Sequence, residues 1–188
     1  MSKVLFVNAC MRGEESRTLQ LCKEYLATKE SFTELNLSNM QLLPFSGDMV
    51  AKRTFLQLSQ QYDESIFDLA RQFAQAEEIV IGAPYWDLSF PAALKIYIEH
   101  ISVSDVTFQL TDRGEYVGLC KAKHITYITS CGGFIAEGAN LGYEYVQGIA
   151  NMFGIPEVRF VVAEGLDVIG LDLEGQMQKA REALSALD

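Results

Sequence analysis

The sequence predicts an α/β protein in which five parallel strands alternate with five helices, as a single domain over residues 1–188. Two observations support this prediction. Short apolar runs rich in β-branched residues recur along the chain, and amphipathic segments with helical spacing separate them. Right-handed crossovers between such strands give a doubly wound sheet with helices on both faces. We expect the strand order 2-1-3-4-5, in which the loops after strands one, three and four meet at one edge.

The first half of the pattern starts with a nearly continuous apolar run at 3–8, which is typical of a central strand covered on both faces. A polar loop at 9–15 follows. Ser16 is a suitable N-cap for a helix whose apolar positions keep helical spacing. The alternation at 32–37 predicts a strand nearer the sheet edge. Residues 38–58 show no clear periodicity, so we expect an irregular excursion there.

The second helix is expected to begin at Ser59, which can cap a helix whose apolar stripe runs to Phe73. The β-branched run at 78–82 predicts the third strand. A loop with the chain's only tryptophan occupies 83–90, and Pro91 is a good first residue for the next helix. The order so far is strand, helix, strand, helix, strand, helix.

The last part of the chain adds an insertion and two more strand–helix units. Residues 106–119 look like a hairpin, which could act as a lid. A fourth core strand is expected at 124–129 and a fourth helix at 141–152, despite two glycines that each cost about 1 kcal/mol relative to alanine. A fifth strand at 158–162 and an amphipathic helix at 173–187 complete the pattern.

Composition narrows the range of functions. The chain has 188 residues, of which 49% are hydrophobic and 21% charged, as in ordinary globular proteins. A formal net charge of −10 and an isoelectric point near 4.7 argue against nonspecific binding to nucleic acid or to an anionic membrane, because either requires a basic surface. The first apolar run is too short for a signal peptide, and no long apolar stretch follows. We therefore expect a cytoplasmic protein.

Cysteine and histidine spacing gives no sign of a metal site. The four cysteines are Cys10, Cys22, Cys120 and Cys131. They lie far apart and form no Cys-x-x-Cys pair, which indicates reduced thiols and speaks against a zinc or iron–sulfur centre. His100 and His124 are also distant from each other, and we interpret both as structural residues.

Three loops, at 9–18, 83–90 and 130–138, should converge at the carboxyl edge of the sheet. The second of these loops holds Tyr85 and Trp86 beside a carboxylate. Large aromatic side chains at this place suit a flat, partly apolar ligand. The alternative is a turn whose aromatic rings only cover the core.

The first loop could bind an anion. Amides at a helix start carry the positive end of the helix dipole, which favours a phosphate group. The hydroxyl groups of Ser16 and Thr18 would add donors, and Arg12 or Arg17 could balance a dianion. The glutamates at 14–15 would have to point away, because carboxylates oppose anion binding. Ordinary helix capping is the alternative.

The third loop contains the sequence Ser-Cys-Gly-Gly at 130–133. Two glycines directly after a strand let backbone N–H groups approach a ligand closely. Such amides suit the electron-rich pyrimidine side of a flavin ring. A simple turn is the alternative interpretation.

A second chemistry must be weighed for the first loop. Cys10 and Arg17 follow the first strand much as the nucleophile and the phosphate-binding arginine do in low-molecular-weight tyrosine phosphatases, which show Cys-x5-Arg-Ser/Thr. This chain has six intervening residues, two of them glutamates. The extra residue would distort the anion cradle, and the glutamates would raise the pKa of a thiol that needs a lowered one. A phosphatase-like hydrolase is therefore a remote alternative.

Five segments taken together resemble the FMN-dependent NAD(P)H:quinone oxidoreductase and azoreductase family. They are Lys-Val-Leu at 3–5, Ser-Arg-Thr at 16–18, Ala-Pro-Tyr-Trp-Asp-Leu at 83–88, Ser-Cys-Gly-Gly at 130–133 and Val-Arg-Phe-Val-Val-Ala-Glu-Gly at 158–165. Each motif is weak alone, but their order and spacing cover nearly the whole chain. Cys10 stands where many members have serine, and Trp86-Asp87 replaces the more usual Tyr-Asn.

The resemblance implies a flavodoxin-like fold, FMN as cofactor and a homodimer with FMN sites at the subunit interface. It also implies which residues bind FMN. The phosphate group would be bound by Ser16, Arg17 and Thr18, the isoalloxazine ring would be lined by Pro84, Tyr85, Trp86, Asp87 and Leu88, and its polar edge would meet Ser130, Cys131, Gly132 and Gly133. No side chain is assigned as catalytic, because the chemistry takes place at the flavin N5.

The resulting hypothesis is an enzyme that passes a hydride from NADH or NADPH through FMN to a quinone or an azo compound. The alternative from another functional class is a flavodoxin-type electron carrier, which binds FMN and turns over no substrate. The hairpin and the glycine-flanked loops favour the enzyme, because a carrier needs no pocket over the flavin. The preference between NADH and NADPH is open, since no Gly-x-Gly-x-x-Gly fingerprint is present.

Overall fold

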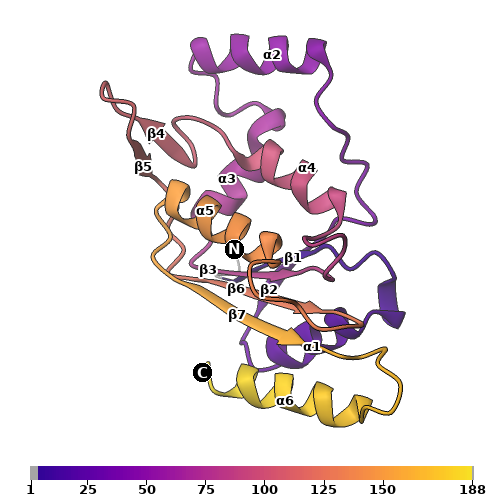
Figure 1. Ribbon diagram of the computed structural model, residues 1–188. Helices are drawn as coiled ribbons and strands as arrows, with labels where there is room; N and C mark the ends of the chain where they lie inside the picture. The colour runs from indigo at the N-terminus through magenta and orange to yellow at the C-terminus, as the bar shows by residue number, and fades with distance from the viewer. Residues whose placement is uncertain (1–3, 188) are drawn as a thin grey trace.

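The parallel sheet is organised around two central strands whose apolar, β-branched side chains are buried. The computed structural model describes residues 4–187 (Figure 1). The central strands are β1 (Val4–Asn8) and β3 (Glu78–Gly82), flanked by β2 (Phe32–Asn36), β6 (Ile125–Ser130) and β7 (Val158–Ala163). All pairings are parallel, in the order β2-β1-β3-β6-β7. With the hairpin strands left out, this is the expected order, so the predicted fold is confirmed.

Helices cover both faces of the sheet, as the amphipathic stripes predict. α1 (Arg17–Leu26) and α6 (Leu173–Ser185) lie on one face, where their apolar side chains form one core cluster. α3 (Asp68–Gln75), α4 (Ala92–Ile101) and α5 (Leu141–Phe153) lie on the opposite face and form a second cluster (Figure 1). None of the helices within residues 4–187 is long and apolar enough to cross a membrane.

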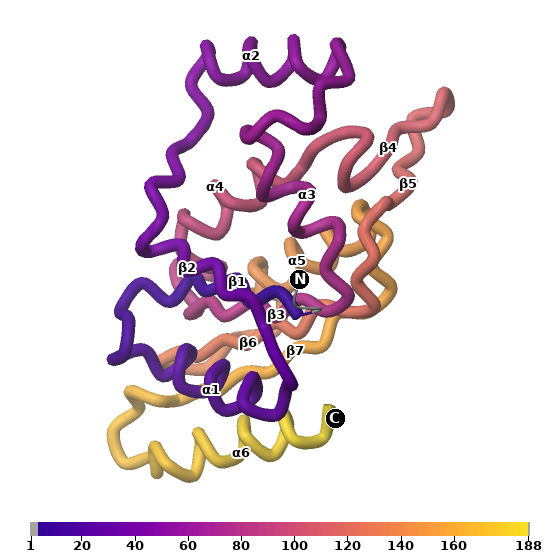
Figure 2. The backbone as a smooth tube through the Cα atoms, turned by 180° about the vertical axis from the view of Figure 1, so that it is seen from behind, coloured from indigo at the N-terminus to yellow at the C-terminus, as the bar shows by residue number. Residues whose placement is uncertain are grey.

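The expectation of an irregular segment at 38–58 was wrong for its second half. Residues Gly47–Leu58 form helix α2, which begins where the Ser46 hydroxyl accepts a hydrogen bond from the Met49 amide (3.3 Å). Leu56 is the one residue of α2 that is fully buried, and the helix lies far from the sheet (Figure 2). A helix that buries so little needs no apolar stripe, which is why the periodicity did not reveal it.

The predicted start of the following helix was also wrong. Ser59 ends α2 instead of beginning a helix, and the next helical residues are the 3₁₀ turn η2 (Ser65–Phe67) and then α3. Tyr62 lies in the connection, where its ring packs against Phe67 (5.7 Å between centroids). An apolar side chain in a loop thus extended the stripe beyond the helix. The described residues hold six α-helices instead of five.

The insertion is a hairpin, as expected. β4 (Phe108–Leu110) and β5 (Tyr116–Gly118) pair antiparallel. Gly118 lies directly against the end of α5, since a Cβ atom there would be 2.0 Å from the Gly154 nitrogen. The hairpin therefore packs on α5 rather than over the carboxyl edge of the sheet.

Candidate functional site

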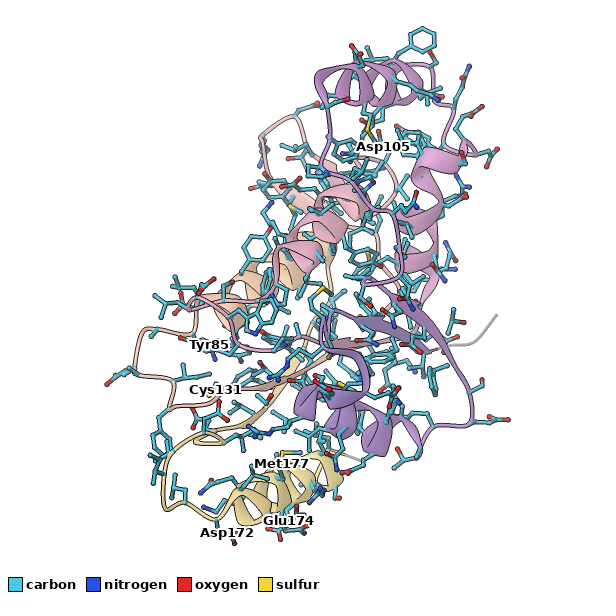
Figure 3. All side chains as sticks on the ribbon, turned by 90° about the vertical axis from the view of Figure 1, so that its right-hand side faces the viewer. Tyr85, Asp105, Cys131, Asp172, Glu174 and Met177 are labelled. Carbon is cyan, nitrogen blue, oxygen red and sulfur yellow. The ribbon has the colours of Figure 1, made fainter. Side chains whose placement is uncertain are left out.

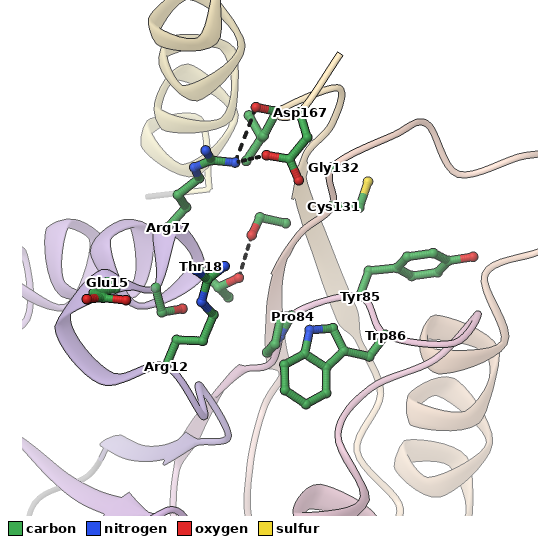
Figure 4. A pocket seen from close by; sticks show the side chains of 13 residues that line it. Arg12, Glu15, Arg17, Thr18, Pro84, Tyr85, Trp86, Cys131, Gly132 and Asp167 are labelled. Carbon is green, nitrogen blue, oxygen red and sulfur yellow. Dashed lines mark hydrogen bonds and ion pairs between the residues drawn. The ribbon is translucent and has the colours of Figure 1, made fainter. Parts of the chain in front are cut away.

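A cavity of about 310 Å³ lies at the carboxyl edge of the sheet, where the loops after β1, β3, β6 and β7 meet (Figure 4). Tyr85 and Cys131, from two of these loops, lie close together on the same side of the molecule (Figure 3). The cavity is lined by Arg12, Glu15, Ser16, Arg17, Thr18, Pro84, Tyr85, Trp86, Ser130, Cys131, Gly132, Leu166 and Asp167. The three loops that the sequence singled out therefore converge, and a fourth, after β7, joins them.

The start of α1 presents hydrogen-bond donors to the cavity. Ser16 is the N-cap, and its hydroxyl oxygen accepts from the Leu19 amide (3.2 Å). The Thr18 and Ser130 hydroxyls are 2.7 Å apart. Within residues 4–187 the backbone amides of Arg17 and Thr18 have no acceptor. Together with the helix dipole, these groups make a donor set that is suited to an anion.

Arg17 is held by the loop after β7. Its Nη1 donates to Asp167 Oδ1 (2.8 Å) and to the Leu166 carbonyl oxygen (3.2 Å). Sequence reasoning missed both partners. An acidic residue a few positions after the last strand carries no motif, and only the tertiary structure brings it to α1.

The expectation that both glutamates of the first loop point away holds for one of them. Glu14 pairs with Lys23 (2.6 Å) outside the cavity. Glu15 lines the cavity, so the expectation was wrong for Glu15; Figure 4 shows it on the side opposite Trp86. Residues Gly13–Glu15 form a 3₁₀ turn, in which successive side chains point about 120° apart, so neighbouring residues cannot share one direction.

The aromatic loop forms one wall of the cavity through Pro84, Tyr85 and Trp86. Two hydrogen bonds hold Tyr85 in place. Its amide donates to the Ser130 carbonyl oxygen (3.0 Å), and its hydroxyl donates to the Ala139 carbonyl oxygen (2.9 Å). The Trp86 side chain stays 42% exposed, so the wall offers an accessible flat apolar surface.

Asp87 and Leu88 were expected at this wall, but they do not line the cavity. Trp86 and Ser89 exchange two backbone hydrogen bonds (3.1 and 2.8 Å), which closes a two-residue turn. Asp87 (φ 51°) and Leu88 (φ 66°) occupy its tip in the left-handed region, with exposed side chains. The tight turn thus carries both side chains to the surface, a feature that the sequence Asp-Leu does not signal.

The glycine loop contributes Ser130, Cys131 and Gly132, whereas Gly133 does not line the cavity. Cys131 Sγ is 3.0 Å from the Gly133 carbonyl oxygen. Burial, together with the nearby Glu164 carboxylate, raises the pKa of Cys131 to about 11. The Cys131 thiol is therefore protonated near neutral pH and is a poor nucleophile.

Cys10 does not line the cavity, which removes the basis of the phosphatase-like alternative. The side chain is 1% exposed, and its Sγ lies 3.5 Å from the Gly82 carbonyl oxygen. A hydrogen bond from the Cys22 thiol lowers the pKa of Cys10, although burial opposes that effect. The expected rise in this pKa was therefore wrong, but a buried sulfur cannot attack a substrate in the pocket.

The remaining predictions for the site concern the hairpin and metals. No residue of 106–119 lines the cavity, so the hairpin is not a lid over the pocket of its own chain. Within the described part of the chain, no group of three or more histidine, cysteine or acidic side chains could hold a metal ion. His100 is buried, bonds the Leu43 carbonyl oxygen through Nε2 (2.9 Å) and stacks on Phe45, which is a structural role.

Comparison with known proteins gives matches over nearly the full length. The model of a family described by its flavodoxin-like fold matches residues 2–187. A curated protein of Clostridium acetobutylicum, named FMN-dependent NADH:quinone oxidoreductase 2, is 36% identical over 97% of this chain and 98% of its own length. A Clostridium perfringens protein named FMN-dependent NADH:quinone oxidoreductase is 34% identical, over 100% of this chain and 98% of its own.

The solved structures include a similar azoreductase from Bacillus anthracis str. Sterne. It superposes with a TM-score of 0.85 at 27% sequence identity, and the match covers 100% of this chain and 98% of the azoreductase chain. The likeness therefore extends over all strands, helices and loops that build the cavity.

Proposed function

Since this chain belongs to the family with the flavodoxin-like fold that matches residues 2–187, we propose that it is an FMN-dependent oxidoreductase. It would take electrons from NADH or NADPH and reduce a quinone or an azo compound. The names of the curated relatives and of the similar azoreductase structure support this assignment. The observation that carries it is the meeting of free hydrogen-bond donors and an exposed aromatic wall in one cavity.

The residues of the cavity fit FMN. The Arg17 and Thr18 amides, with the Ser16 and Thr18 hydroxyl groups, form a donor set suited to a phosphate. Charge-assisted hydrogen bonds of this type contribute roughly 1.5–3 kcal/mol each. This set would hold the phosphate end of the cofactor.

The other walls fit the ring system. Pro84, Tyr85 and Trp86 would line it, and the hydrogen bonds of Tyr85 keep this wall in position. The amides of Gly132 and Gly133 have no acceptor within residues 4–187, and Gly132, which lines the cavity, can donate to a polar ring edge. The Asp87 and Leu88 amides at the turn also have no acceptor within residues 4–187, but neither residue lines the cavity. When bound, FMN would accept a hydride from the nicotinamide and pass the electron pair to the acceptor.

Steady-state NADH oxidation with a soluble quinone tests the proposal. Without oxygen, we expect the purified, FMN-loaded protein to oxidise at most one equivalent of NADH per FMN, and to sustain NADH oxidation only when the quinone or an azo dye is present. Full FMN loading without turnover would favour an electron carrier instead. An NADPH arm at the same concentration gives the donor preference, which the fold leaves open.

We also propose a cytoplasmic homodimer. Four free cysteines support a reducing compartment. Exposed apolar side chains support a second copy as partner, since Phe55 is 63% and Leu58 is 82% exposed on α2. Light scattering after gel filtration should give twice the chain mass, and the mass of a single chain would contradict this proposal.

A further inference from the structure

The two arginines of the cavity differ in what they contact. Arg17 donates to Asp167 and to the Leu166 carbonyl oxygen. The Arg12 side chain has no hydrogen bond or ion pair with any of residues 4–187, although it lines the same cavity. Figure 4 shows Arg12 pointing into the pocket between Glu15 and Trp86. The Arg17 guanidinium is therefore already bonded within the protein, whereas the Arg12 guanidinium is available to bind a ligand.

We propose that Arg12 is the cation that recognises the flavin phosphate, and that Arg17 is a positioning residue that holds the pocket wall. This inference rests on the proposed function, because it concerns the ligand of the same pocket. From the sequence, either arginine could balance the charge of the phosphate. The structure separates the two, with Arg12 binding the phosphate and Arg17 holding the wall.

Arg12 is well placed because its loop is fixed by backbone hydrogen bonds. The Gly13 amide donates to the Cys10 carbonyl oxygen (3.2 Å), and the Ser16 amide donates to the Gly13 carbonyl oxygen (2.9 Å). Gly13 takes φ +55°, which turns the chain directly after Arg12. A guanidinium held at this place can bind a phosphate without first giving up a partner, and guanidinium–phosphate pairs are strong and often bidentate.

Arg17 is placed to hold two loops together. The loop after β7 is bonded to the glycine loop through the Gly165 amide to the Gly133 carbonyl oxygen (2.7 Å) and the Asp167 amide to the Gly132 carbonyl oxygen (2.9 Å). Asp167 also fills the space beside Gly132, where a Cβ atom would lie 2.3 Å from Oδ2. Arg17 ties this pair of loops to α1. The Asp167 carboxylate also offsets the Arg17 charge, which reduces its attraction for a phosphate.

Comparison of FMN with riboflavin separates the two roles, because riboflavin has the ring but lacks the phosphate. Binding of each is measured by quenching of flavin fluorescence. We expect Arg12→Gln to weaken FMN binding about tenfold and to leave riboflavin binding within about twofold. Arg12→Lys should recover part of the loss. Arg113→Gln, which removes an exposed hairpin arginine, is the matched control and should change neither affinity.

The positioning role of Arg17 has a different signature. Arg17→Gln should weaken FMN and riboflavin by the same factor, and Asp167→Asn should reproduce that effect. The double variant should be no worse than either single variant. Both should alter the visible circular dichroism of the bound ring in the same way, whereas Arg12→Gln should leave it unchanged.

Three outcomes would overturn the inference. The first is a selective loss of FMN over riboflavin in Arg17→Gln, and the second is an equal loss of both in Arg12→Gln; either one leaves the proposed function standing. If the unmodified protein bound neither flavin, the proposed function would fail and this inference with it.

Discussion

The two edges of the sheet differ in how their polar groups are satisfied. At the amino edge, Glu78 accepts from the Tyr25 hydroxyl (3.2 Å) and pairs with Lys29 (3.2 Å) and His124 (3.3 Å). At the carboxyl edge, the Arg17 and Thr18 amides have no acceptor among the described residues. An edge whose charges neutralise one another stabilises the fold. An edge whose amide donors have no partner can bind a ligand. The contrast separates polar groups that stabilise the fold from polar groups that are available for binding.

The largest effect is expected where the carboxyl edge rests on the core. A Cβ atom at Gly82 would lie 2.5 Å from Cys22 Sγ, which is fully buried. We expect Gly82→Ala to lower the free energy of unfolding by about 2 kcal/mol, because overpacking strains the core. Gly133→Ala is the control, since no atom lies within 4 Å of its Cβ position. Equal stability of the two variants in chemical denaturation would contradict the expectation.

Two serine N-caps with the same hydrogen-bond pattern sharpen the comparison. Ser16 caps α1 at the cavity, and Ser46 caps α2 far from it. We expect each serine-to-alanine change to cost about 1 kcal/mol of stability. Only Ser16→Ala should also raise the Kd for FMN, by about tenfold, because it removes a donor to the phosphate. Thermal unfolding and FMN titration check both parts, and an equal loss of FMN affinity in Ser46→Ala would break the contrast.

The contacts at the amino edge should make the stability of the fold depend on pH and not on ligand binding. Although desolvation opposes it, hydrogen bonds from His124 and Lys29 lower the pKa of Glu78 to about 2. Because the pKa in the folded state lies below the ordinary 4.5, Glu78 stabilises the fold above pH 4.5, and this contribution is lost as pH falls toward about 2.

Glu78→Gln should therefore lower the free energy of unfolding by about 1 kcal/mol at neutral pH, a value discounted for solvent screening. The deficit should shrink as the pH falls from 4.5 to about 2 and vanish below that, because Glu78 takes up a proton. Glu30→Gln, which changes an exposed carboxylate near the same edge, is the matched control. Urea unfolding at several pH values measures the difference in stability between each variant and the unmodified protein. A deficit that stayed constant with pH would contradict the role of the Glu78 charge.

The smallest effect concerns the turn beside the cavity. Leu88 has φ 66° and is 51% exposed, and a left-handed conformation costs a residue with a Cβ atom. We expect Leu88→Gly to raise the free energy of unfolding by about 0.5 kcal/mol, since relief of strain exceeds the entropy cost of glycine. Gln60 also has a left-handed backbone (φ 53°) but lies away from the carboxyl edge, and Gln60→Gly should raise the free energy of unfolding by a similar amount. A loss of stability in Leu88→Gly alone would show that the leucine side chain has packing contacts worth more than the strain.

Most of the fold could be predicted because its elements bury apolar faces. The β-branched run of β3 and the stripe of α6 carry their periods in the sequence. Helix α2 could not be predicted in this way, because it buries Leu56 alone. The start of α3 was misplaced for the opposite reason, since Tyr62 continues an apolar stripe through a loop.

The sequence by itself determined the sheet order and the meeting of three loops at one edge, because parallel strands bring their carboxyl ends together. Only the tertiary structure decided which side chains face the cavity. It brought Asp167 to Arg17 across 150 positions of sequence and turned Asp87 and Leu88 outward. Hydrophobic periodicity encodes which face of an element is buried. Contacts between distant polar side chains depend on how the loops close, and they leave no periodic signal in the chain.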